Sequence, residues 1–182
     1  VPFDAKRRGP EERAAMLEKL GFSKFAYDYR AEHIPTFDQE IESLKRHKVE
    51  LTAWWFPTSL NDDAQKTLEL FKRHGVKPQL WVSGGGAPTK DAAEQAQRVE
   101  IEVKRIRPIA EAAAQQGLKV ALYNHGGWYG EPENQLAIIA ELRKEAGAIA
   151  VVRYAVAEEI LHEIHLVRQQ VAGIAGAVGV IA

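Results

Sequence analysis

Hydrophobic and polar positions along this chain follow two alternating spacings, one typical of amphipathic helices and one typical of buried strands. A short repeat marks the boundaries between them, because residues 45–49 (KRHKV) and 72–76 (KRHGV) recur 27 residues apart. Each copy closes a helical pattern and opens an apolar one, so the repeating unit is a helix followed by a strand. Basic residues complement the negative end of a helix, and we therefore interpret His47 and His74 as structural residues.

The first half of the chain predicts two helices, each followed by a strand. Residues 10–20 have a helical pattern, and residues 24–28 form a short strand. Residues 36–39 (TFDQ) match a capping box, in which the first and last side chains bond to backbone amides at the start of a helix. That helix should extend to about His47, before a strand at residues 49–56.

The second half continues the alternation. Asn61 should cap a helix, and residues 90–116 form a long helix with apolar side chains every three or four positions. Pro108 should kink or divide that helix. Pro132 falls in the first turn of the last helix, where proline is tolerated. The remaining strands should begin near Val76, Leu118 and Ala148.

Strands separated by helices pair in parallel, so the pattern predicts an α/β fold with about five to six parallel β/α units. No G-x-G-x-x-G follows the first strand, and the glycines at 84–86 lack the Lys-Ser/Thr of a P-loop, so nothing favours a nucleotide-binding open sheet. A complete (β/α) barrel needs about 250 residues, whereas this chain has 182. We predict a single domain over residues 1–182 that forms an incomplete TIM barrel, with an exposed strand edge that favours self-association.

Composition narrows the choice of partners. A net charge of -1, from 24 basic and 25 acidic residues, gives no electrostatic footprint for nucleic acid or for an anionic membrane. No apolar run approaches the length of a membrane span, and no cysteine can form a disulfide or a thiolate metal site. The sequence begins at Val1 rather than Met, so we expect a soluble protein that is either cytoplasmic or exported after removal of an N-terminal segment.

The segment after the Leu118 strand is the richest in candidate chemistry, because residues 124–128 (NHGGW) directly follow an apolar run. The carboxyl ends of strands carry the active site in β/α barrels, and glycines let a backbone turn tightly beside a ligand. We therefore identify His125 as a candidate catalytic residue, and Asn124 and Trp128 as candidate substrate-binding residues. A glycine-rich loop with a hydrogen-bonded histidine remains an open alternative.

Other strand ends add candidates. Asp28 is a candidate general base, although it could instead bond to the backbone of the adjacent loop. Tyr27 and Trp81 are candidate substrate-binding residues at neighbouring strand ends. Successive strand residues face opposite ways, so only one of Trp54 and Trp55 can line a pocket, and we assign that role to Trp54.

Four segments in this order resemble the sugar phosphate isomerase/epimerase group of xylose isomerase-like TIM barrels: 27–30 (YDYR), 50–56 (ELTAWWF), 81–86 (WVSGGG) and 120–128 (VALYNHGGW). The resemblance covers about residues 5–147. It implies a sugar or sugar phosphate as the small-molecule partner, and a divalent Mn, Mg, Co or Zn held by Glu, Asp, His and Glu from successive later strands. The metal would polarise substrate oxygens while a carboxylate moves a proton next to a carbonyl.

This chain departs from the ligand pattern that the resemblance implies. The first metal-binding Glu would fall at Asn124, a neutral and weaker ligand, and the next strand carries Arg153 where an Asp is expected. The other ligands would lie beyond Ala182. We therefore expect weak or absent metal binding and an incomplete or inactive isomerase or epimerase. The alternative is a non-catalytic carbohydrate-binding or degenerate barrel protein, and a metal-dependent endonuclease is disfavoured because a basic groove is missing.

Residues 148–182 form a tail of atypical composition, since they contain no Asp, Asn, Lys, Ser, Thr, Pro, Phe or Trp. A shifted reading frame, a truncation or a divergent end would each produce this change. Glu159, His162 and His165 recur every three residues within it. They lack the His-Glu-x-x-His spacing of a zinc helix, so we interpret them as a solvated helix face.

Overall fold

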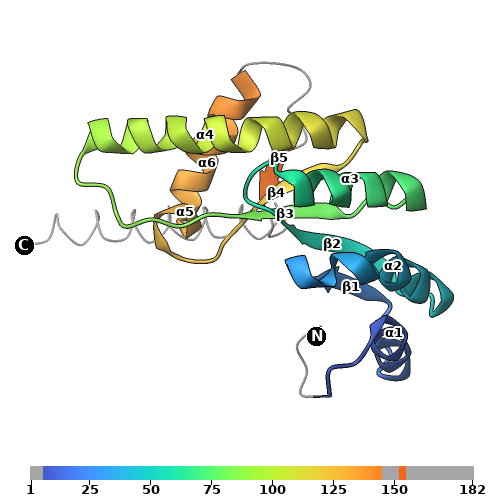
Figure 1. Ribbon diagram of the computed structural model, residues 1–182. Coiled ribbons are helices and arrows are strands. Elements are labelled where there is room, and N and C mark those ends of the chain that lie inside the picture. Colours follow the sequence, from blue (N-terminus) through green and yellow to red (C-terminus); the bar gives the residue numbers. More distant parts are fainter. Residues whose placement is uncertain (1–5, 145–151, 155–182) are drawn as a thin grey trace, which may run out of the picture.

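The computed structural model describes residues 6–144 and 152–154, in which strands and helices alternate along the chain (Figure 1). The strands are β1 (Lys24–Tyr27), β2 (Glu50–Phe56), β3 (Gln79–Ser83), β4 (Lys119–Tyr123) and β5 (Val152–Tyr154). The helices are α1 (Pro10–Lys19), the 3-10 helix η1 (Ala31–Thr36), α2 (Phe37–Arg46), α3 (Asp62–His74), α4 (Ala92–Gln115), α5 (Gly127–Gly130) and α6 (Pro132–Lys144).

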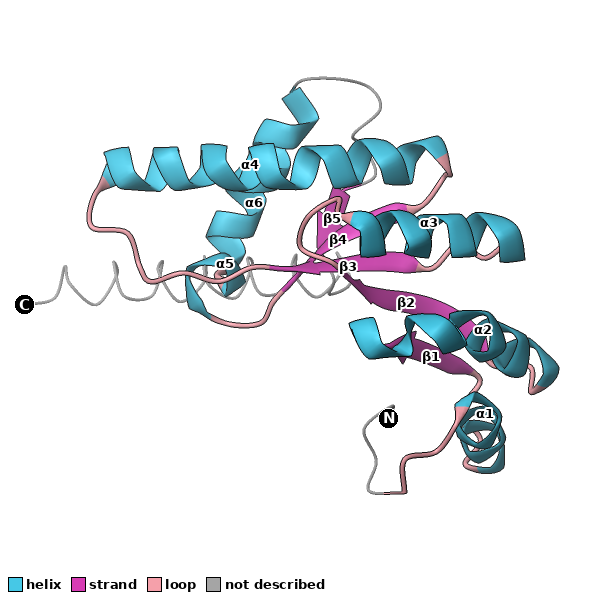
Figure 2. Ribbon diagram, in the orientation of Figure 1, coloured by secondary structure: helices cyan, strands magenta, loops and turns pink. Residues whose placement is uncertain are grey.

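The five strands form one sheet in the order β1-β2-β3-β4-β5, and every neighbouring pair is parallel. Figure 2 shows the helices arranged around one side of this curved sheet. Sequential order with parallel pairing is the topology of a (β/α) barrel, whereas a doubly wound sheet reverses its strand order. The predicted α/β fold, an incomplete TIM barrel of parallel β/α units, is therefore confirmed.

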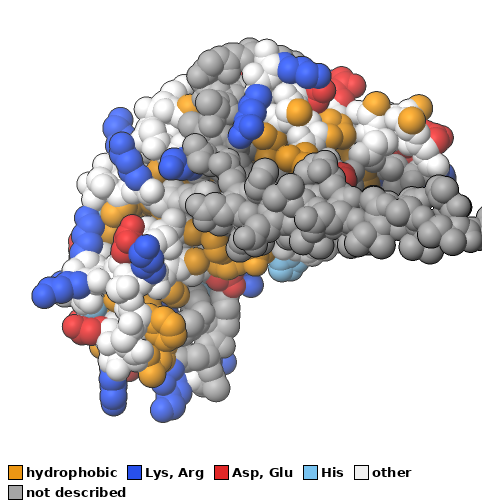
Figure 3. Space-filling model, turned by 180° about the vertical axis from the view of Figure 1, so that it is seen from behind, with side chains coloured by type: hydrophobic (Ala, Val, Ile, Leu, Met, Phe, Trp, Pro, Cys, Tyr) orange, Lys and Arg blue, Asp and Glu red, His pale blue; other side chains and the backbone are white. Residues whose placement is uncertain are grey.

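The two faces of the sheet are covered differently. On the face toward the helices, the side chains of Tyr27, Trp54, Leu80, Val120 and Leu122 are all fully buried. On the opposite, concave face the large side chains of Trp55, Trp81 and Tyr123 are only partly buried, whereas the small Ala53 and Ala121 are covered. Figure 3, seen from behind, shows hydrophobic side chains gathered on the inside of the bend and charged side chains along the outer rim.

One irregularity interrupts the register of the sheet. Phe25 pairs with Leu51, but the next residue, Ala26, pairs with Ala53, so Thr52 has no partner residue in β1. The Thr52 hydroxyl donates to the carbonyl oxygen of Phe25 at 3.2 Å. An extra residue of this kind is a β-bulge, and it exchanges the two faces of the strand on either side of it.

Two expected local features differ from the structure. Thr36 does precede α2, but its hydroxyl donates backward to the His33 carbonyl oxygen at 2.9 Å, and it caps no amide of the helix. The capping-box interpretation is therefore wrong, because η1 runs into α2 and leaves Thr36 in a turn conformation. Asn61, by contrast, accepts the Ala64 amide at 3.0 Å as predicted.

Pro108 lies inside α4, yet the helix is one element from Ala92 to Gln115. A kink or break was expected because proline removes one amide donor. The buried residues Val103 and Ile106 before the proline, and Ile109 and Ala113 after it, lie along one face of the helix. Burial on both sides of Pro108 holds the two halves in one helix at the cost of one hydrogen bond, so the proline does not divide it.

Ionic contacts fix the amino-terminal helices. Arg13 of α1 and Glu40 of α2 form a buried ion pair, and Arg13 also donates to the Arg8 carbonyl oxygen. Burial raises the pKa of Glu40, against the opposing effect of the Arg13 guanidinium. His47 bridges Glu11 and Glu18 from the end of α2, at 2.9 and 2.7 Å. These contacts tie α1 to α2 and bear out the structural interpretation of His47.

His74 has a similar position at the end of α3, where its Nε2 lies 2.6 Å from Asp38 Oδ1. Its carbonyl oxygen accepts from Lys45 in the last turn of α2 at 2.6 Å, and α3 ends here before β3, so His74 lies at the amino-terminal end of the strands, as predicted. Among residues 6–144, no helix is both long and apolar enough to cross a membrane. The strand expected from Ala148 is described only as β5 at Val152–Tyr154, and Glu159, His162 and His165 lie outside the described residues. A single domain over residues 1–182 stays a prediction.

Candidate functional site

A cavity of about 570 Å³ opens at the carboxyl ends of the first four strands, on the concave face. Its polar walls come from Asp28 and Arg30 after β1, Ser83 at the end of β3 and His125 after β4. Its apolar walls come from Phe25, Ala26 and Trp55. Parallel strands end at one edge of the sheet, so residues nearly one hundred positions apart in sequence share this cavity.

The charges on the cavity wall compensate each other. Arg30 Nη1 lies 3.0 Å from Asp28 Oδ1, and the same nitrogen donates to the Tyr29 carbonyl oxygen at 3.1 Å. The Asp28 side chain is 29% exposed, so it is accessible from the cavity. No hydrogen bond joins Ser83, His125 and Asp28 to one another, which argues against a nucleophilic triad in this arrangement.

Tyr29 anchors the strand end that carries Asp28. Its hydroxyl donates to Asp63 Oδ2 at 2.7 Å, at the start of α3. Burial and this hydrogen bond to a carboxylate raise the pKa of Tyr29 to about 12, so the phenol stays protonated at neutral pH. The contact holds the loop after β1 against the neighbouring β/α unit, next to the cavity.

An aromatic cluster continues the concave face beside the cavity. Trp55 meets Trp81 edge-on with ring centroids 4.5 Å apart, and Trp81 stacks on Tyr123 at 5.0 Å. The His125 imidazole is tilted against Tyr123 at 6.0 Å. All three aromatic side chains are partly exposed, so this face offers flat apolar surface next to polar groups.

The structure brings Asp28 and His125 onto one cavity, and it places Trp81 in the adjoining aromatic cluster. Ser83 and Arg30, which the sequence does not mark as site residues, line the same cavity together with Trp55. Strand alternation made Trp55 the alternative to Trp54. The bulge at Thr52 determines which of Trp54 and Trp55 points toward the cavity, and the sequence does not indicate the bulge.

Tyr27 and Trp54 require a correction of placement. Both side chains are fully buried on the helix-facing side of the sheet, where their rings stack at 4.2 Å. Trp54 also meets Phe37 of α2 and Phe71 of α3 edge-on. Because register determines which way each strand residue points, these two aromatic rings form core and do not line the cavity.

Asn124 and Trp128 also differ from the expected arrangement. Asn124 is exposed, but its Oδ1 accepts the Gly126 amide at 3.1 Å, so the side chain stabilises its own turn. Trp128 is 3% exposed, and its Nε1 donates to Gln95 Oε1 at 2.7 Å. The indole is therefore part of the packing between loops and offers no free face to a sugar.

The donors near the cavity do not fit the metal centre that the family resemblance implies. In residues 6–144 no group of three or more His, Asp or Glu side chains could hold a metal ion. Asp28 is engaged with Arg30, and Asn124 with its own backbone. A hard divalent cation prefers several carboxylate oxygens together, and the described residues at the cavity do not supply them.

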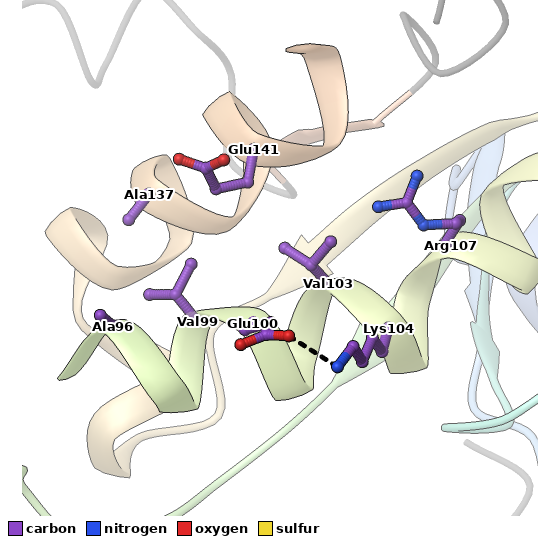
Figure 4. A pocket seen from close by; sticks show the side chains of 8 residues that line it. All are labelled: Ala96, Val99, Glu100, Val103, Lys104, Arg107, Ala137 and Glu141. Carbon is purple, nitrogen blue, oxygen red and sulfur yellow. Dashed lines mark ion pairs between the residues drawn. The ribbon is translucent and has the colours of Figure 1, made fainter. Parts of the chain in front are cut away.

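A second cavity, of about 470 Å³, lies between α4 and α6 (Figure 4). Val99, Val103 and Ala137 form its apolar wall, and Glu100 pairs with Lys104 at 2.6 Å beside it. It belongs to the outer helical layer, away from the carboxyl ends of the strands where β/α barrels carry their sites. We therefore place the candidate site in the concave cavity.

Comparison with solved structures agrees with this architecture. The chain is similar to a crystal structure of D-psicose 3-epimerase in the presence of D-fructose, with a TM-score of 0.52 and 17% sequence identity. The shared feature is the fold, an incomplete TIM barrel of parallel β/α units. The match covers 81% of this chain and 57% of the epimerase chain, so this chain spans little more than half the length of the epimerase. No protein-family model and no curated protein matches the sequence.

Proposed function

We propose that the concave cavity binds a small sugar, and that this part of the barrel supplies sugar recognition in an isomerase- or epimerase-like protein. The proposal rests on the composition of the cavity wall, where hydrogen-bonding side chains lie next to an aromatic ring. The hydrogen-bonding residues are Asp28, Arg30, Ser83 and His125, and the aromatic residue is Trp55. Sugars present hydroxyl groups in the plane of the ring and C–H groups above it. A wall with hydrogen-bonding groups next to an aromatic face suits both.

The charge balance of the cavity favours an uncharged sugar over a sugar phosphate. Arg30 is the cation on the cavity wall, and it is already paired with Asp28 at 3.0 Å. A phosphate group would have to compete with Asp28 for the guanidinium and would then approach the carboxylate itself. Neutral hydroxyl groups can bond to both partners of the ion pair without breaking it.

Asp28 and His125 are the acid–base groups on the cavity wall, so they are the proposed catalytic residues. Isomerisation or epimerisation needs a proton moved next to a carbonyl, and it also needs the negative charge on the carbonyl oxygen stabilised. Asp28 and His125 are proposed to meet the first requirement. For the second, the described residues include no group of three or more His, Asp or Glu side chains that could hold a metal ion. We therefore propose recognition with little turnover by this chain alone. A non-catalytic carbohydrate-binding protein is the alternative.

Titration with unlabelled sugars tests the proposal directly. D-fructose and D-psicose are the probes, because the similar structure is an epimerase named for D-psicose and determined with D-fructose. We expect chemical-shift changes in the Trp55 and His125 side chains, saturating in the millimolar range, about the affinity of a small neutral ligand with few buried contacts. Fructose 6-phosphate should bind no more tightly than fructose.

Two variants locate the binding site. Trp55→Ala should weaken fructose binding about ten-fold, which is the order expected for loss of an aromatic contact. Glu100→Ala, on the wall of the cavity between α4 and α6, is the matched control and should bind as the parent protein does. Saturable binding that survives Trp55→Ala but is lost in Glu100→Ala would move the site to the helical layer. Absence of any saturable shift with both sugars would overturn the proposal.

Turnover separates the two functional alternatives. Ketose interconversion can be followed by chromatography after incubation with Mn²⁺ or Mg²⁺. We expect binding with conversion at or near background. Clear conversion that depends on both Asp28 and His125 would instead show a complete catalytic site.

A further inference from the structure

Two glycine-rich loops hold each other at the edge of the concave cavity. One follows β3 at residues 84–91, and the other follows β4 at residues 124–131. The Trp128 amide donates to the Gly86 carbonyl oxygen at 2.8 Å, so backbone contacts backbone. Figure 1 shows α5, which lies in the second loop, next to the connection from β3 to α4.

Glycine is required at two points of this contact. A Cβ at Gly84 would overlap the Tyr129 ring, and a Cβ at Gly127 would lie 2.8 Å from the Gly86 carbonyl oxygen. Gly127 also has a φ of +64°, which other residues rarely adopt. Ser83 directly precedes the first loop and His125 lies in the second, so the fit between the loops bears on the positions of both cavity residues.

A closed hydrogen-bond network locks the pair of loops to the helices that follow them. Gln95 of α4 accepts from the Trp128 indole at 2.7 Å and from the Thr89 hydroxyl at 2.8 Å. Its amide nitrogen donates to Asn134 Oδ1 of α6 at 2.6 Å, and Asn134 in turn donates to the Trp128 carbonyl oxygen at 2.6 Å. Arg98 covers the indole at 5.5 Å and donates to the Ala87 carbonyl oxygen at 2.6 Å.

We propose that Gln95 and Asn134 are positioning residues, which hold the Trp128 indole so that the His125 imidazole faces the cavity. The inference rests on the proposed sugar site. Gln95 uses its acceptor for two donors and its donor for Asn134, so it joins the loop after β3, the loop after β4 and α6. Trp128 and Asn124 then stabilise the turn from both sides of His125, although neither lines the cavity.

The test measures the orientation of His125 separately from sugar binding. Six histidines give resolvable imidazole signals by NMR, and His125→Gln assigns the one of interest. Gln95→Leu removes all three hydrogen bonds of the side chain and should shift the His125 signal and its contacts to Tyr123. It should also weaken fructose binding about five-fold, the order expected from one lost hydrogen bond.

A conservative variant and a matched control separate positioning from general destabilisation. Gln95→Glu keeps the acceptor for the Trp128 indole, so it should return the His125 signal most of the way to its original position. Thr67→Val removes one buried hydrogen bond in α3, from the Thr67 hydroxyl to the Asp63 carbonyl oxygen at 2.7 Å, and should leave the His125 signal unchanged.

The outcomes are distinct. A His125 signal that is unchanged in Gln95→Leu, or that moves as much in Thr67→Val, overturns the positioning role. If Gln95→Leu does not fold, Asn134→Asp replaces it, since the aspartate keeps the acceptor for Gln95 and loses only the donor to Trp128. If the parent protein binds neither sugar, the proposed function fails, while the shift of the His125 signal still decides the positioning role.

Discussion

Aromatic residues occur on both faces of the sheet, but they form the core on the helix-facing side and line the cavity on the concave side. Trp54 and Trp55 are adjacent in sequence, yet Trp54 is fully buried among aromatic rings of the helical layer, whereas Trp55 lines the concave cavity. Tyr27 and Tyr123 show the same contrast at the ends of β1 and β4. An aromatic residue near a strand end is therefore weak evidence for a site, and the direction in which it points is the deciding property.

The largest expected effect is on the helix-facing side. Trp54→Ala should lower the free energy of unfolding by about 3–5 kcal/mol, because a large buried side chain leaves a cavity among packed rings. Trp55→Ala should cost much less, since its side chain is already partly exposed. Urea denaturation of both variants measures the difference. Equal losses of stability would show that the two faces are buried alike.

The ion pair behind the sheet gives the second effect. Arg13→Met should destabilise the protein by about 3–5 kcal/mol, because it leaves the Glu40 carboxylate buried without its partner. The double variant Arg13→Met/Glu40→Leu should recover most of that loss, since an apolar pair of similar volume needs no desolvated charge. Chemical denaturation of the single and double variants measures the recovery. A double variant as unstable as the single one would mean that the contacts of Arg13 with the segment before α1 dominate.

A smaller effect concerns metal on the concave side. Isothermal titration with Mn²⁺ or Mg²⁺ should give no binding tighter than about millimolar, because the donors beside the cavity are few and already engaged. Asn124→Glu should not change this, since residue 124 serves its own turn. A micromolar dissociation constant in the parent protein, or a marked gain in the variant, would show that the side chain reaches a metal position.

The smallest effect is a pH dependence at the amino-terminal helices. Hydrogen bonds to Glu18 and Glu11 raise the pKa of His47, so its stabilising contribution is present below pH 6.5 and is lost as the pH rises through the raised pKa. Hydrogen bonds from Arg46 and His47 lower the pKa of Glu11 to about 2, so its contribution is present above pH 4.5 and lost as the pH falls toward 2.

His47→Gln is the variant that checks this pH dependence. It should flatten the alkaline side of a plot of melting temperature against pH and leave the Arg13–Glu40 pair intact. Because the groups lie near the surface, salt should weaken the effect. A profile that stays unchanged in His47→Gln would remove the histidine from this role.

The fold could be predicted from the sequence because the same pattern of apolar and polar positions repeats along the chain. Helical and strand spacings recur in each β/α unit, and local signals such as Asn61 at a helix start need only nearby residues. The candidate site was predictable only in part. Asp28 and His125 follow directly from strand ends, and both line the cavity.

The remaining site residues depend on contacts between distant segments. Trp128 is buried with its indole Nε1 hydrogen-bonded to Gln95, and the sequence around Trp128 does not indicate that partner. Thr36 fails as a cap because η1 precedes it, although its sequence matches the motif. In each case the local sequence is compatible with more than one environment or hydrogen-bond partner for the side chain. Tertiary contacts determine which of these the residue has in the folded protein.

The unpaired residue in β2 has a consequence for how this sheet can change in length. Thr52 takes up a difference of one residue between β1 and β2, so loss of a residue at this point could be repaired by removing the bulge. Loss of Ala53 with the bulge kept in place would instead turn Trp55 toward the helices and Trp54 toward the cavity. A one-residue deletion at Thr52 should therefore be tolerated during evolution, whereas a deletion that exchanges the directions of Trp54 and Trp55 should be eliminated because it removes Trp55 from the cavity wall.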